Sequence, residues 1–243
     1  MDLFGVIIRI VSTLMLLRKN KMTTKKELID YESEEKAIIR RKIAETINEE
    51  YRKDNTTACL DLFGGGESYE YFTTHTKARI LSIDDNPIIG KRMKKLPGTR
   101  NISIADLCKE GREKLNIHFL DFCGVLGYKM IEDLMLLPKI MTEKGFLFIT
   151  LRNGRETPFG KGTMREAVEI GLSGMIEKIF ARNSIKMTKI TAVKYTSFAK
   201  TEGERISKAG TSMKVYKFRW ETIKDTALPI PYIENELLSV ENL

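Results

Sequence analysis

The chain has 243 residues, of which 42% are apolar, enough to bury the core of one large domain. Its 41 lysines and arginines exceed its 33 aspartates and glutamates, and the formal net charge of +8 favours an acidic partner, with nucleic acid the first candidate. The three cysteines lack CxxC spacing and only two histidines accompany them, so we expect neither a metal site nor a disulfide framework, and a cytoplasmic location.

The first 22 residues form an apolar N-terminal extension. Residues 3–17 (LFGVIIRIVSTLMLL) are apolar except for Arg9, Ser12 and Thr13. This stretch is shorter than the roughly 20 residues that span a bilayer, and it lacks the basic start and cleavage site of a signal peptide. We therefore favour a helix packed on the domain, or an extension upstream of a start at Met22, over a membrane anchor.

Helical periodicity begins at residue 25 and continues to residue 52, with apolar residues at three- and four-residue spacing. Five short apolar runs follow, separated by segments of helix length, and these runs are residues 57–63, 78–84, 101–106, 117–122 and 145–151. Runs that are apolar throughout are typical of parallel strands buried on both faces. The segments between and after them predict helices at residues 67–75, 87–96, 128–144 and 161–182.

Two further runs, residues 185–198 and 212–220, alternate in part and predict an antiparallel hairpin. Strands that alternate with helices indicate a doubly wound α/β fold. The sequence therefore predicts one three-layer α/β/α domain at residues 23–220, with a mostly parallel seven-stranded sheet that ends in the hairpin. Residues 221–243 turn acidic and contain two prolines, which indicates a loosely attached C-terminal tail.

An acidic residue ends each of four successive predicted strands. These residues are Asp61 before three glycines, Asp84 with Asp85 and Asn86 after it, Asp106 followed by Leu107, and Asp121 followed by Phe122, Cys123 and Gly124. Ligands of open parallel sheets bind beyond the carboxyl ends of the strands. One aspartate there commonly caps the next helix, but four beside a glycine turn are harder to assign to capping alone.

Residues 25–220 resemble the class I S-adenosylmethionine-dependent methyltransferases, and DLFGGGES resembles their first motif in the form common among nucleic-acid methyltransferases. The resemblance implies that Asp61 faces the cofactor's amino group, that Asp84 or Asp85 accepts the ribose hydroxyls, and that Asp106 bonds the adenine. It places the catalytic candidates Asp121, Phe122 and Cys123 beside the transferred methyl group. The implied cofactor-binding candidates are Asp61, Phe63, Gly64, Gly65, Gly66, Asp84, Asp85, Asn86, Asp106 and Leu107.

The sequence departs from the family pattern at two motifs. The glycines are consecutive rather than alternate, and Glu67 occupies a place where another glycine is common. The fourth motif is neither the Asn/Asp-Pro-Pro-aromatic sequence of amino-group methyltransferases nor the Pro-Cys pair of the cytosine-C5 enzymes. A nucleophilic role for Cys123 is therefore less favoured than that of a small buried apolar residue.

Two other functions are weighed against the same residues. A nicotinamide-dependent oxidoreductase requires GxGxxG, whereas the sixth position from Gly64 is Tyr69. A nucleic-acid-binding protein that keeps the fold without catalysis fits the altered fourth motif. His75 and His118 are isolated, and we expect structural or surface roles for both.

Direct methyl displacement requires alignment of donor and acceptor and sometimes removal of a proton, and we assign this to Asp121. Tyr128 and Tyr195 are candidates for base stacking, although a core position suits each better. RNA, DNA, a protein side chain and a small molecule remain as acceptors, and oligomeric state stays open. Basic clusters favour a nucleic acid, although a solvated basic surface explains them equally, and these residues are Lys91, Arg92, Lys94, Lys95, Arg152 and Arg155.

Overall fold

The computed structural model describes residues 30–122, 128–152, 176–177, 179–201, 204–205 and 210–223. Several expectations fall outside these residues: the N-terminal extension, nearly all of the C-terminal tail, most of the helix expected at residues 161–182, Cys123 and Arg155. Within the described part of the chain, no helix has both the length and the apolar character needed to cross a membrane.

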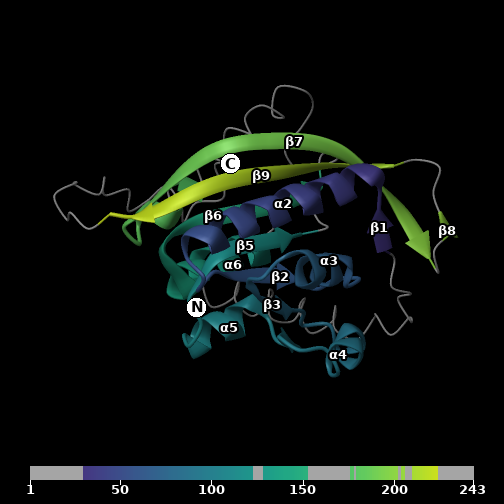
Figure 1. Cartoon of the computed structure of the whole chain (residues 1–243), viewed down its shortest axis with the longest axis horizontal. Helices are drawn as coiled ribbons and strands as arrows, with labels where there is room; N and C mark the ends of the chain where they lie inside the picture. Colours follow the sequence, from purple (N-terminus) through teal and green to yellow (C-terminus); the bar gives the residue numbers. More distant parts are fainter. Residues whose placement is uncertain are drawn as a thin grey trace, which may run out of the picture.

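One sheet runs through the described molecule in the order β1-β7-β9-β6-β5-β2-β3-β4 (Figure 1). Neighbours from β4 to β6 pair in parallel, and β9 pairs antiparallel with both β6 and β7. The expected seven-stranded sheet with its C-terminal hairpin is confirmed. Its strands are β2 (Ala58–Leu62), β3 (Arg79–Ile83), β4 (Thr99–Arg100), β5 (Leu115–Asp121), β6 (Met141–Arg152), β7 (Ile185–Thr201) and β9 (Thr211–Thr222).

Two short strands not expected from the sequence extend the sheet beyond β7. The strand β1 (Asp30–Glu32) pairs antiparallel with residues 198–200 of β7, and β8 (Glu204–Arg205) pairs with the end of the same strand. Both lie beside the far end of β7 in Figure 1. The chain therefore joins the outer edge of the sheet immediately before its leading helix begins.

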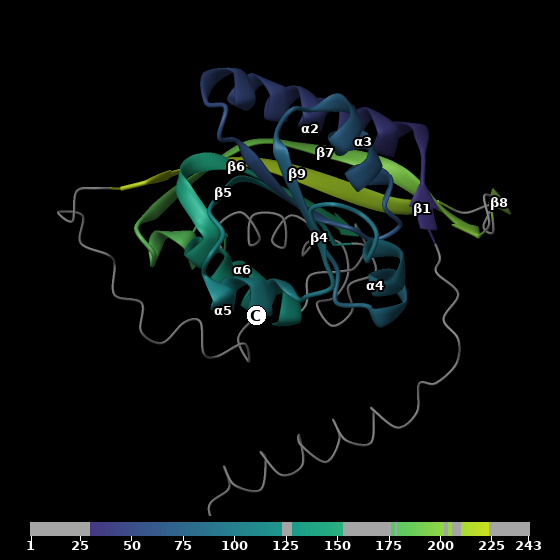
Figure 2. The ribbon, with the colours of Figure 1, turned by 60° about the horizontal axis from the view of Figure 1, so that its bottom comes forward.

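Helices cover both faces of the sheet, as Figure 2 shows. On one face α2 (Glu34–Lys53), α3 (Glu67–His75) and α4 (Pro87–Met93) bury an apolar cluster that includes Ile47, Phe72 and Met93. On the other face α5 (Ile104–Glu110), α6 (Tyr128–Leu136) and the 3₁₀ turn η1 (Leu137–Ile140) pack Leu107, Leu134 and Ile140 into a second cluster. This arrangement is the expected three-layer architecture.

Two predicted boundaries are wrong, each because a local signal was given too little weight. The third strand is β4, and the residues expected as a strand at 101–106 instead start α5, because Ser103 caps that helix. The helix expected at residues 128–144 ends at Leu136 and a 3₁₀ turn follows, since Pro138 lacks the N–H that a continued α-helix needs. The next strand, β6, starts at Met141.

Candidate functional site

The strand order reverses between β2 and β5, so the crevice expected to bind ligands lies at the carboxyl ends of these two strands. Asp61 lies in β2 and Asp121 ends β5, while Asp84 follows β3 directly. Three of the four expected acidic residues therefore share this edge of the sheet with the glycine turn.

The glycine turn joins β2 to α3 and requires glycine at two of its three positions. Gly64 and Gly66 have φ angles of +49° and +100°, in the left-handed region that side chains disfavour. A Cβ on Gly66 would lie 3.0 Å from the ring of Phe63, whereas the corresponding position at Gly64 faces open space. The triplet is a defined turn with backbone accessible at Gly64.

Glu67 folds back over the middle glycine. Its carboxylate lies 2.5 Å from the position that a Cβ on Gly65 would occupy. Glu67 is also the first residue of α3, where a negative charge is favourable at the helix N-terminus. The departure from the family pattern thus puts a carboxylate directly against the glycine turn.

Asp61 is fully buried beneath this turn. The hydroxyl of Ser82 donates to Oδ2 at 2.6 Å, and Oδ1 has no hydrogen-bond partner among the described residues. Burial raises the pKa of Asp61 to about 7, with a further rise from Asp121 and opposing effects of Ser82, Ser68 and Lys36. A buried acceptor left unsatisfied in this way is costly, and it is a natural position for a ligand's donor group.

Asp84 ties the glycine turn to the loop that follows β3. Its Oδ2 accepts from the backbone N–H of Gly64 at 3.2 Å, and its Oδ1 accepts from that of Asn86 at 2.8 Å. Burial raises the pKa of this half-buried carboxyl above its usual range. Asn86 itself caps α4, since its Oδ1 accepts from the N–H of Ile88 at 2.9 Å.

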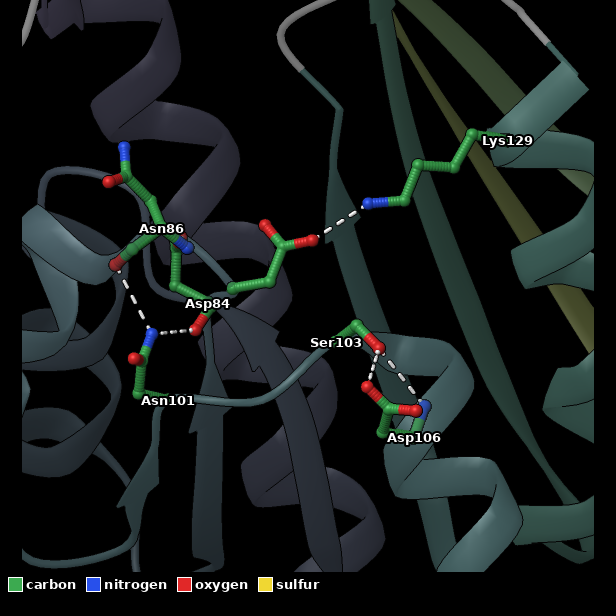
Figure 3. Close-up of polar contacts among 7 residues, drawn as sticks. Asp84, Asn86, Asn101, Ser103, Asp106 and Lys129 are labelled. Atoms are coloured by element: carbon green, nitrogen blue, oxygen red, sulfur yellow. Dashed lines mark hydrogen bonds and ion pairs between the residues drawn. The ribbon is translucent and has the colours of Figure 1, made fainter. Parts of the chain in front are cut away.

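Asp85 contacts the helix that follows β5. It forms an exposed ion pair with Lys129 of α6, whose Nζ lies 2.7 Å from Oδ2 (Figure 3). Ion pairs this exposed contribute little to stability. The pair nevertheless connects the loop after β3 with the helix that follows β5.

Asn101, which the sequence did not single out, holds the Asp84 loop in place. Its Nδ2 donates to the carbonyl oxygens of Asp84 at 2.6 Å and Asn86 at 3.2 Å (Figure 3). A Cβ on Gly90 of α4 would overlap this amide group. The only sequence signal for the contact is a glycine within a helix that otherwise has no need of one.

Asp106 does not end a strand, contrary to expectation. It lies exposed in the first turn of α5, where it accepts a hydrogen bond from the Ser103 hydroxyl at 2.7 Å and its own N–H donates to that oxygen at 3.1 Å (Figure 3). It also pairs with Lys109, and the neighbouring Leu107 is fully buried in the core. Ser103 is thus the N-cap of α5, and Asp106 has a structural role in stabilising that cap.

Asp121 forms a buried ion pair with Lys36, a residue of the leading helix α2 that sequence reasoning missed. Lys36 Nζ lies 3.0 Å from Oδ2 of Asp121, and each side chain is 11% exposed. Ser33 caps α2 by accepting from the N–H of Lys36 at 3.1 Å, which fixes the helix start at this position. The adjacent Phe122 is partly buried against the core, and Cys123 lies outside the described residues.

The histidines and Tyr195 make packing contacts that fit structural roles. His118 is fully buried, its ring centroid lies 5.3 Å from that of Trp220, and burial lowers its pKa to about 4. His75 stacks on Tyr71 at the end of α3, and Tyr195 is buried. Among the described residues no group of histidine, cysteine, aspartate and glutamate side chains is arranged to hold a metal ion.

The expected basic residues that the structure describes are all exposed. Four of them lie in the second half of α4 and just after it, and one ends β6; they are Lys91, Arg92, Lys94, Lys95 and Arg152. They are accessible to a polyanion.

No protein-family model matches the sequence, and no characterised protein sequence matches it. Solved structures match it in fold. Trm1 from Pyrococcus horikoshii, determined with S-adenosyl-L-methionine, superposes with a TM-score of 0.56 at 16% identity, over 83% of this chain and 58% of that one. The plantazolicin methyltransferase BamL, determined with SAH and a triazolic desmethylPZN analog, gives a TM-score of 0.53 at 12% identity, over 78% of this chain and 87% of that one.

The chain has the class I methyltransferase fold. The strand order and the antiparallel β9 between β6 and β7 agree with this assignment. A class I methyltransferase fold at such low identity carries no information on substrate, so the functional conclusion depends on the site itself.

Proposed function

We propose that the chain is an S-adenosylmethionine-dependent methyltransferase that acts on nucleic acid. The observation that supports this most is the fully buried Asp61, whose Oδ1 lacks a hydrogen-bond partner among the described residues, directly before the glycine turn. A cationic donor, such as the amino group of the cofactor's methionine part, would satisfy that oxygen.

The ribose fits Asp84. Each carboxylate oxygen can accept two hydrogen bonds, and each oxygen of Asp84 accepts one from the backbone of Gly64 or Asn86. One acceptor site therefore remains on each oxygen, which suits the two hydroxyls of a vicinal diol. The open space at Gly64 lets the main chain approach the ligand.

S-adenosylmethionine supplies a methyl group that is activated by attachment to a sulfonium. The protein's task is then to orient the acceptor and exclude water. Asp121 lies at the end of β5 where it can accept a hydrogen bond from the acceptor group, and Lys36 holds that carboxylate in position. Phe122 lies next to it as an apolar side chain at the edge of the core.

A nucleic-acid acceptor is supported by charge. The net charge is +8, and the side chains of Lys91, Arg92, Lys94 and Lys95 are exposed together in and after α4. Such residues bind phosphate groups without reading sequence. Arg152, at the end of β6, adds a further cation.

Calorimetric titration with S-adenosylmethionine tests the cofactor assignment. We expect binding by the parent protein, at least tenfold weaker binding by Asp84→Ala and Asp61→Asn, and unchanged binding by the matched control Asp106→Ala, an aspartate in the exposed helix cap nearby. Absence of heat for the parent, or equal affinity in all four proteins, contradicts the assignment. Tight binding of NAD instead would support an oxidoreductase.

Transfer of a radiolabelled methyl group to fractionated RNA, DNA and protein from the source cell tests the reaction. Label in RNA or DNA supports the proposal, and label only in protein contradicts the nucleic-acid acceptor. Cofactor binding without label in any pool would favour a nucleic-acid-binding protein that lacks catalysis.

A further inference from the structure

Three ionisable side chains gather near the glycine turn. Asp61 comes from β2, Asp121 from β5 and Lys36 from α2. Asp61 is fully buried, and the side chains of the Lys36–Asp121 ion pair are each 11% exposed. Both Asp121 and Lys36 are close enough to affect the pKa of Asp61, in opposite directions.

Two serine hydroxyls also affect Asp61. Ser82 of β3 donates to it at 2.6 Å, and Ser68 of α3 also stabilises its charged form. Cys59, two residues earlier in β2, is buried with its pKa raised, first by burial and then by Asp61. Asp121 opposes ionisation of Asp61, and Lys36 favours it.

The Lys36 ammonium contacts Asp121 directly at 3.0 Å, whereas its effect on Asp61 is an attraction without a direct contact that favours the charged form. A second buried negative charge without its own partner is strongly disfavoured, and the remaining carboxyl responds by retaining a proton. Asp61, with its pKa near 7 and Oδ1 unsatisfied among the described residues, is that carboxyl.

We infer that Lys36 is a positioning residue that holds Asp121 in place, and that the cofactor's amino group binds Asp61 by displacing a proton from it into solvent. The inference rests on the proposed function for the identity of the ligand. The proton balance is simple, because a neutral carboxyl group becomes a carboxylate paired with the incoming ammonium. Cofactor binding is therefore linked to proton release below about pH 7.

The protein without cofactor offers a first test. The pKa of Asp61 is raised on folding from about 3.8 to about 7, so its contribution to stability is present at low pH and is lost as pH rises through 7. Lys36→Met removes the cation that opposes this rise. We expect it to lower the guanidinium unfolding midpoint more at pH 8 than at pH 5.

Control variants separate charge from packing. Lys42→Met removes an exposed lysine of the same helix, paired with Glu45, and should shift the midpoint equally and slightly at both pH values. Asp61→Asn imitates the protonated carboxyl, so its midpoint should change less between pH 5 and pH 8 than that of the parent. An equal loss for Lys36→Met at both pH values, or an unaltered pH dependence for Asp61→Asn, overturns the inference.

Titration with S-adenosylmethionine in two buffers of different ionisation enthalpy measures the released protons. With a pKa of about 7, we expect about nine-tenths of a proton released per bound cofactor at pH 6 and about one-quarter at pH 7.5. Binding without proton release at pH 6 overturns the inference and leaves the proposed function intact. If the cofactor does not bind at all, the proposed function fails, while the unfolding measurements still test Lys36.

Discussion

Replacement of Gly90 by alanine is expected to disturb the site from a position outside it. Gly90 lies in α4, and an alanine Cβ there would overlap the side-chain amide of Asn101. Asn101 would have to turn away and lose its hydrogen bonds to the carbonyls of Asp84 and Asn86. The loop that carries Asp84 would then be held to the end of β4 only by the backbone bond from the Asp84 N–H to the Arg100 carbonyl among the described contacts.

The expected magnitude follows from two opposing effects. Two hydrogen bonds of an exposed amide contribute about 1–2 kcal/mol together, whereas alanine favours a helix over glycine by up to about 1 kcal/mol. Gly90→Ala should therefore cost about 0–1 kcal/mol in the parent protein. In an Asn101→Ala background the clash is gone, and the same change should stabilise the protein by up to about 1 kcal/mol.

A double-mutant cycle by urea unfolding measures the coupling between these residues, which we expect at about 1–2 kcal/mol. Both single variants should also bind S-adenosylmethionine roughly 3- to 10-fold more weakly, because Asp84 is less firmly placed. A coupling below about 0.5 kcal/mol, the range of independent sites, would refute this reasoning. So would stabilisation by Gly90→Ala in the parent protein.

Three other substitutions test separate features. Glu67→Gln should tighten S-adenosylmethionine binding roughly threefold at low salt and less at high salt, because it removes a negative charge beside the glycine turn; weaker binding in calorimetry would contradict this. Asp106→Ala should lower the thermal midpoint slightly while leaving cofactor affinity unchanged, as a helix cap requires. Gly145→Ala should cost about 3 kcal/mol or more in urea unfolding, because its Cβ would overlap the carbonyl of Asn116 and meet the Trp220 ring, and a near-neutral result would show that β6 shifts freely.

The order of elements was predictable because parallel strands buried on both faces leave a strong signal in the sequence. The runs around Leu60, Leu81 and Leu147 are apolar throughout, and the structure buries all three residues. The short β4 was misplaced by two residues or more because the apolar residues after it, Ile102 and Ile104, belong to a loop and a helix start. Local apolar character alone does not separate these states.

The site residues whose location follows from their position relative to a strand could be predicted from the sequence. Asp61 and Asp84 lie at strand ends, and chain order alone brings such residues to one edge of a parallel sheet. The contacts of Lys36 and Asn101 join residues 85 and 17 positions apart; no local pattern indicates the first, and Gly90 is the only sequence signal for the second. The placement of Asp106 at a strand end was wrong for a local reason, since Ser103 three residues earlier caps a helix that includes Asp106.

The pairing of β1 with β7 affects when during synthesis the site can form. Residues 30–32 precede α2 directly, and their strand partners are residues 198–200, made almost last in the described chain. A nascent chain that has emerged only through β6 can form the glycine turn and its aspartates, but the start of α2 still lacks its strand partner. Because contacts across such long stretches of sequence form slowly, we expect the strand that precedes α2 to join the sheet late in folding. The start of α2, which carries Lys36, is then fully anchored only after β7 has been made.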